Sequence, residues 1–219
     1  MMNQVINDLL AKQEQELKMM GKIAQVLCHH LRDNTVELSL DKEHGAVINF
    51  LPYDDLAVDL NDSSWLTYQG FYQLAPIVLA SSRLDSTIDL DNWYNSLTAT
   101  VDRFHLEIYE DADFDIEFYV QALAQLNFDG MLAVGEGVLF VAQCTVARMV
   151  TNSEEEAFGR EYFKRTYNAL HKFLNNENIS NAIESLSREL REKKELDSDY
   201  LTRYLQEKIG AFGSGLPVV

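Results

Sequence analysis

The segment RFHLEIYEDADFDIEFYVQ, residues 103–121, decides the fold that this sequence predicts. Its large apolar residues share one parity on each side of the turn-like sequence EDAD: Phe104, Leu106, Ile108, Phe114, Ile116, Phe118 and Val120. Acidic residues occupy most of the positions between them. Alternation with a period of two is typical of β-strands that bury one face. The segment therefore predicts a β-hairpin with an apolar face and a strongly acidic face.

Further hairpins are predicted on both sides of this segment. The turn sequences NFDG and GEG precede VLFVAQCTVARMV, so a meander of antiparallel strands is expected from Phe104 to Val150. Upstream, TVELSL and AVINFL alternate across the turn DKEHG. Two segments stay open, because LAVDL fits a strand or the edge of a loop and YVQALAQL fits a strand or a helix. The predicted fold is α+β, with an antiparallel sheet of about five or six strands.

Apolar residues at three- and four-residue steps predict helices in the N-terminal and central parts of the chain. A long helix is expected from about Asn3 to Arg32. The segment LAPIVLASSRL predicts a short buried helix with Pro76 in its first turn. The next segment, DLDNWYNSLTATVDRF, predicts a helix that Asp89 or Asp91 can cap. One or two central helices are therefore expected beside the sheet.

The C-terminal part of the chain predicts three more helices. The sequence TNSEEE contains a capping box formed by Ser153 and Glu156, and apolar residues at helical spacing follow it. The expected organisation is an acidic α+β core domain over residues 1–150. A C-terminal helical region, residues 151–219, is expected to pack on the core or to extend from it.

Composition limits the class of protein. The chain has 219 residues, of which 47% are hydrophobic, so it can bury a core of its own. No run of 18 apolar residues occurs, and the N-terminus has mixed charge and many amides where a signal peptide would be basic and then apolar. Cys28 and Cys144 are expected to be free thiols. These features predict a cytoplasmic protein.

The charge of the chain is unevenly distributed. The net charge is −17, and residues 33–129 contain 19 acidic residues against three basic ones, a balance of −16. From residue 151 to the end, 12 acidic residues face ten basic ones. An acidic field of this kind repels phosphate, so neither direct nucleic-acid binding nor binding to anionic membranes is expected.

No established catalytic motif occurs in the sequence. It contains no P-loop, dinucleotide fingerprint, nucleophile elbow or zincin helix. The adjacent histidines of CHHL point about 100° apart on a helix, so they do not form a zinc site by themselves. The segment YDDLAVDLNDSS lacks the central glycine and the closing glutamate of a calcium loop. We therefore predict no catalytic residue, cofactor or metal ligand.

The acidic face of the predicted hairpin is the candidate site. Tyrosines among carboxylates suit interfaces with cationic partners. The residues predicted to bind a partner lie on this face and in the loop before it: Glu107, Tyr109, Glu110, Asp111, Asp113, Asp115, Glu117, Tyr119, Asp54, Asp55 and Asp59. A solvated face without any function is the competing interpretation of the same pattern.

These observations favour a non-catalytic interaction protein. Its acidic surface is expected to dock on a basic protein surface, such as the nucleic-acid-binding cleft of a nuclease, toxin or DNA-processing enzyme. Inhibitors, immunity proteins and antirestriction proteins that mimic DNA are of this kind. One alternative is a chaperone or assembly adaptor that binds through apolar helix faces and can form a homodimer. Another is a metal-assisted hydrolase that uses the carboxylates together with His105.

Overall fold

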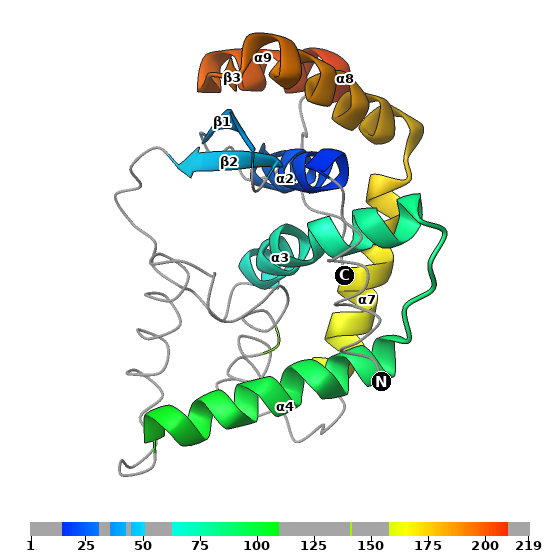
Figure 1. The fold of residues 1–219 in the computed structure, drawn as a ribbon. Helices are drawn as coiled ribbons and strands as arrows, with labels where there is room; N and C mark the ends of the chain where they lie inside the picture. The colour runs from blue at the N-terminus through cyan, green and yellow to red at the C-terminus, as the bar shows by residue number, and fades with distance from the viewer. Residues whose placement is uncertain are drawn as a thin grey trace.

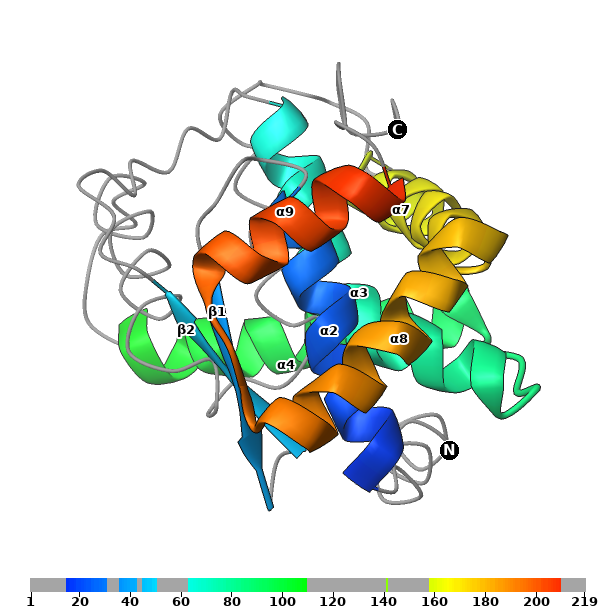
Figure 2. The same cartoon turned by 90° about the horizontal axis from the view of Figure 1, so that it is seen from above.

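The computed structural model of the chain describes residues 15–30, 36–42, 45–50, 63–109, 141 and 158–209 (Figure 1, Figure 2). These residues form six helices of two turns or more and one small antiparallel sheet. The helices are α2 (Gln15–His30), α3 (Ser63–Arg83), α4 (Leu90–Tyr109), α7 (Phe158–Leu174), α8 (Glu177–Lys193) and α9 (Ser198–Ile209). The strands are β1 (Val36–Asp41), β2 (Gly45–Phe50) and β3 (Glu195–Leu196).

The sheet has the strand order β2-β1-β3, with β1 antiparallel to both neighbours. Leu38 is the centre of the register, because it lies opposite Ile48 of β2 and Leu196 of β3. The predicted hairpin of TVELSL and AVINFL is confirmed as β1 and β2. The prediction of a sheet of five or six strands is wrong, because the described residues are mostly helical and contain three strands.

The first strand of the predicted acidic hairpin is wrong, because its residues belong to helix α4. The helix continues to Tyr109, so residues 104–109 are helical. The same apolar residues also fit a helix, since Leu97, Val101, Phe104 and Ile108 recur at three- and four-residue steps. Val141, inside the last predicted strand, is helical as well. The remaining residues of the predicted meander, 110–140 and 142–150, lie outside the described residues, as does LAVDL.

Helix α3 is longer than the sequence pattern predicts. It begins at Ser63, so Pro76 lies in its interior and the prediction of a first-turn proline is wrong. A proline has no N–H to bond the carbonyl four residues earlier, which is that of Tyr72. Gln25 of α2 donates its side-chain amide to this carbonyl at 3.0 Å. The α2–α3 contact thus offsets part of the cost of a proline inside the helix.

Helix α2 is the centre of the core. Within the predicted helix from Asn3 to Arg32, residues 15–30 are confirmed as helical, and the rest lie outside the described residues. All six residues from Ile23 to Cys28 are buried, which is typical of a helix enclosed on all sides. The views agree on its neighbours, since α3 lies beneath α2 and the pair α8 and α9 lies above it (Figure 1, Figure 2).

The three C-terminal helices are confirmed as α7, α8 and α9. Asn176 caps α8 by accepting the backbone N–H of Asn178 at 3.0 Å, and Asp197 caps α9 by accepting that of Tyr200 at 2.7 Å. Leu186 and Leu190 of α8 are fully buried in the same core as α2. Because β3 pairs with β1, the C-terminal region also contributes a strand to the N-terminal sheet. The predicted capping box at Ser153 lies outside the described residues.

Candidate interaction surface

Two of the eleven residues predicted to bind a partner belong to the described residues. Glu107 and Tyr109 lie in the last turn of α4. The other nine lie outside the described residues: Asp54, Asp55, Asp59, Glu110, Asp111, Asp113, Asp115, Glu117 and Tyr119. In a strand, residues 107 and 109 would share a face, but in a helix they are about 200° apart. The prediction that this pair lies in a β-strand is wrong, because both residues are helical.

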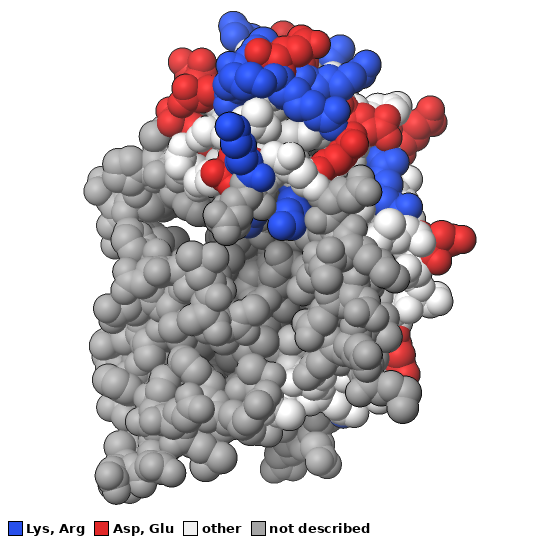
Figure 3. All heavy atoms as spheres, viewed as in Figure 1, with Lys and Arg blue, Asp and Glu red and all other residues white. Residues whose placement is uncertain are grey.

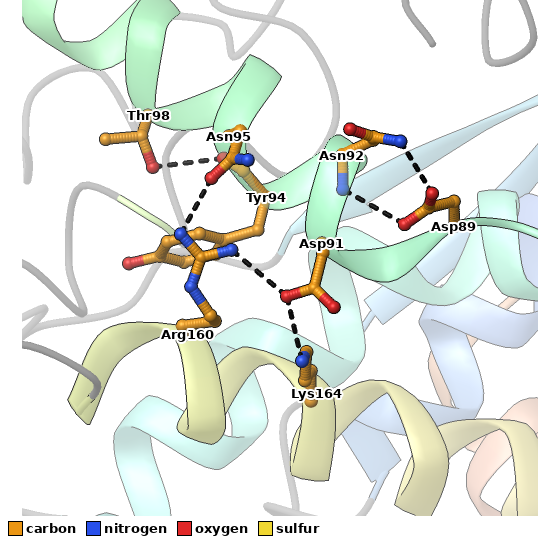
Figure 4. A network of polar contacts seen from close by, with 8 residues as sticks. All are labelled: Asp89, Asp91, Asn92, Tyr94, Asn95, Thr98, Arg160 and Lys164. Atoms are coloured by element: carbon orange, nitrogen blue, oxygen red, sulfur yellow. Dashed lines mark hydrogen bonds and ion pairs between the residues drawn. The ribbon is translucent and has the colours of Figure 1, made fainter.

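Helix α4 begins where the sequence predicted a cap. Asp89 accepts the backbone N–H of Asn92 at 3.1 Å, and its second carboxylate oxygen accepts the side-chain amide of Asn92 (Figure 4). The carbonyl of Asp89 accepts the first helical hydrogen bond, from Trp93 at 2.9 Å. Of the two candidates, Asp89 is the capping residue. Asp91 has another role.

Asp91 joins α4 to α7 through two cations (Figure 4). Its carboxylate lies 2.8 Å from Nζ of Lys164 and 3.1 Å from Nη1 of Arg160. The second terminal nitrogen of Arg160 donates to Asn95 at 2.7 Å, and the guanidinium lies over the ring of Tyr94, 5.0 Å from its centroid. The hydrogen bond from Lys164, followed by that from Arg160, lowers the pKa of Asp91 below its usual value. We call these five residues the α4–α7 junction.

An aromatic layer lies beneath the α4–α7 junction. Trp93 is 1% exposed and packs edge-on against Phe163 and Tyr167, with centroid distances of 5.1 and 6.1 Å. Tyr94 packs against Phe163 at 5.5 Å. Aromatic pairs at these distances contribute about 0.5–1.5 kcal/mol each beyond the burial of area. The aromatic layer and the charges together fix the first turns of α4 on the scaffold.

The junction has the chemistry of a structural contact. Its carboxylate is held ionised by two cations, and no serine, cysteine or histidine is among its members. Within the described part of the chain, no three His, Cys, Asp or Glu residues lie close enough together to hold a metal ion. The chain runs from this fixed helix directly into the acidic sequence EDADFDIE, residues 110–117.

The ion pairs of Asp91 with α7 were not predicted from the sequence. Arg160 and Lys164 are four residues apart, which places them on one face of α7, and this spacing was the available signal. Their partner lies 69 residues before Arg160, and a local pattern carries no information about such a distant pair.

The face formed by α8 and α9 differs in charge from residues 33–129, which are strongly acidic. Lys and Arg gather over these helices, with Asp and Glu around and between them (Figure 3). Arg191 pairs with Glu16 of α2 at 2.5 Å, and Lys193 pairs with Glu189 at 3.2 Å. Residues 158–209 contain ten basic and nine acidic residues. Exposed pairs of this kind contribute about 0–1 kcal/mol each, so they mainly balance the surface charge.

Cys28 lies in the core and is fully buried. Burial raises the pKa of its thiol far above the usual value, so the reactive thiolate does not form at neutral pH. The side chains of His29 and His30, and the whole of Cys144, lie outside what the structure describes. His171 is exposed on α7, with its Nε2 atom 3.2 Å from the side-chain amide of Asn175.

Among the described residues, none of the helices is both long enough and apolar enough to cross a bilayer. A comparison with protein-family models, curated proteins and solved structures gave no match to this chain.

Proposed function

We propose that this chain is a non-catalytic interaction protein whose acidic segment, residues 33–129, docks on a basic protein surface and occludes it. The observation that carries the proposal is the distribution of charge. This segment has 19 acidic residues against three basic ones, whereas the helices of residues 158–209 have nine against ten. Negative charge that only keeps a protein soluble can be spread over its whole surface. The concentration of acidic residues in one part of this chain therefore favours recognition of a basic partner.

The α4–α7 junction supports the proposal through its position. It fixes α4 on α7 through Asp91, and the densest acidic run begins in the last turn of α4 with Glu107. A charged surface contributes most to binding when its scaffold is held in place before the partner arrives. The rigid start of α4 provides such a support.

The proposed mechanism is electrostatic steering followed by steric occlusion. The acidic segment would attract a basic surface over about one Debye length, which is about 8 Å at physiological ionic strength. A basic surface that normally binds nucleic acid is the partner of matching charge, so a nuclease, a toxin or a DNA-processing enzyme is the proposed class. The proposed setting is the cytoplasm, where Cys28 and Cys144 would stay reduced.

The described helices provide less support for a chaperone or adaptor. That function needs accessible apolar faces, but the apolar residues of α7, α8 and α9 that form stripes are buried in the core, for example Leu170, Leu186 and Leu205. Among the described residues, only Val47 and Leu84 are large hydrophobic residues classed as exposed. Two separate exposed residues are normal on a protein surface.

The proposal is tested with two variants that lose the same amount of negative charge. The first replaces Glu107, Asp113, Asp115 and Glu117 by their amides. The control replaces four exposed carboxylates on α7, α8, β3 and α9 that have no ion-pair partner among the described residues: Glu161, Glu192, Glu195 and Glu207. Both variants are compared with the native chain for binding to a partner isolated from the native host. Binding by that partner of a short DNA duplex is measured in competition.

The first variant is expected to lose binding at least tenfold and to stop displacing the DNA. The control is expected to stay within about twofold of the native chain, because its charges lie outside the acidic segment. Equal losses in both variants would mean that only net charge matters and would refute a defined docking segment. Unchanged binding in both would favour recognition through apolar contacts.

A further inference from the structure

We draw no further inference here: the strongest candidate, the exposed face of α8 and α9 over which Lys and Arg gather (Figure 3), carries at least as many carboxylates as cations, and nothing in the structure shows what covers it.

Discussion

The side-chain amide of Gln25 in α2 donates a 3.0 Å hydrogen bond to the backbone carbonyl of Tyr72 in α3. Pro76 lies four residues after Tyr72 and removes the N–H that would bond this carbonyl within the helix. Gln25 is 2% exposed, so the bond is made out of contact with water. Gly21, one turn earlier in α2, allows the helices to approach at this point, since a Cβ there would lie 3.1 Å from Cβ of Pro76. Helix α2 therefore supplies a donor to a carbonyl that Pro76 cannot bond within α3.

The first prediction concerns this bond. Gln25→Leu is expected to lower the free energy of unfolding by about 0.5–1.5 kcal/mol, because it removes a buried hydrogen bond to the Tyr72 carbonyl. Part of the cost is offset, since the side-chain oxygen of Gln25 has no hydrogen-bond partner among the described residues and its removal is favourable. Urea denaturation followed by far-UV circular dichroism measures the difference.

A double-mutant cycle separates the hydrogen bond from general packing. In a Pro76→Ala background, the N–H of residue 76 can bond the Tyr72 carbonyl within α3, so Gln25→Leu should cost less. The expected coupling energy is at least about 0.5 kcal/mol. If Gln25→Leu has the same cost in both backgrounds, the amide does not replace the bond that the proline removes.

The second prediction concerns Gly45, the first residue of β2. Its φ is +77°, and a Cβ there would lie 2.4 Å from the backbone nitrogen of Met19 and 2.8 Å from the carbonyl oxygen of Gln15. Gly45→Ala is therefore expected to cost more than about 2 kcal/mol, because strain at positive φ adds to a collision with the α2 backbone.

Gly45→Asn identifies which of these two effects dominates. Asparagine tolerates positive φ better than alanine does, but it brings the same Cβ. Because the collision is with backbone atoms, both variants should be destabilised to a similar extent in thermal unfolding. A cost below about 0.5 kcal/mol for either variant would show that β2 is not packed this closely on α2.

The third prediction concerns two helix ends that use a non-glycine residue in the left-handed region. Asp85 follows α3 with a φ of +48°, and the N–H of Ser86 bonds the carbonyl of Ser81 at 2.9 Å, as in a Schellman motif. Lys194 ends α8 with a φ of +69°, and its N–H bonds the carbonyl of Leu190 at 2.9 Å. Glycine adopts this conformation without a steric penalty.

Asp85→Gly is expected to raise the free energy of unfolding by about 0.5–1 kcal/mol. Lys194→Gly is expected to give less, because it also removes the bond from Nζ of Lys194 to the carbonyl of Arg191. Differential scanning calorimetry should detect a rise in Tm of about 1–4 °C for Asp85→Gly. Alanine at the same positions serves as the control and should not raise Tm. A lower Tm for Asp85→Gly would contradict the assigned helix end.

The fourth prediction concerns the pH dependence that Asp91 gives to the α4–α7 junction. Hydrogen bonds from Lys164 and Arg160 lower its pKa in the folded state below the unfolded value. Its contribution to stability is therefore present above the unfolded pKa and is lost as the pH falls through the folded pKa. The native chain should be more stable than Asp91→Asn at neutral pH, and the two stability curves should converge in acid.

Glu161→Gln is the matched control for Asp91, because it removes an acidic charge from the α7 side of the same region without breaking an ion pair among the described residues. At neutral pH it should cost less stability than Asp91→Asn, because it breaks no ion pair among the described residues. A difference between the native chain and Asp91→Asn that stays constant between pH 7 and pH 3 would mean that Asp91 is not held by the two cations.

Local patterns predicted the elements whose signals are local. The alternation around Leu38, the cap at Asp89 and the three C-terminal helices each lie within a few residues of their causes. The strand prediction for residues 104–109 was wrong because their apolar spacing fits both a strand and a helix, and these residues are helical in the structure. The predicted acidic hairpin required residues 104–109 to form a strand, and this error contributed to a predicted sheet that was too large.

Other features depend on residues far apart in the sequence. Pro76 indicates a helix start unless a donor such as Gln25, 47 residues before Tyr72, reaches the free carbonyl. The two-residue strand β3 is too short to leave a pattern and exists because Leu196 lies beside Leu38. The partner of Arg160 at Asp91 is equally distant. Tertiary contacts of this kind decide the fold without any sign in a local window.

The most direct test of the proposed function is the association rate of the full chain with its captured partner, measured by stopped-flow fluorescence at 50 and 300 mM NaCl. We expect at least a tenfold fall in the association rate constant at the higher salt concentration, with the dissociation rate nearly unchanged. The variant with Glu107, Asp113, Asp115 and Glu117 neutralised should already be slow at low salt and should show a shallower dependence. An association rate that does not change with salt in the native chain would contradict recognition through the acidic segment.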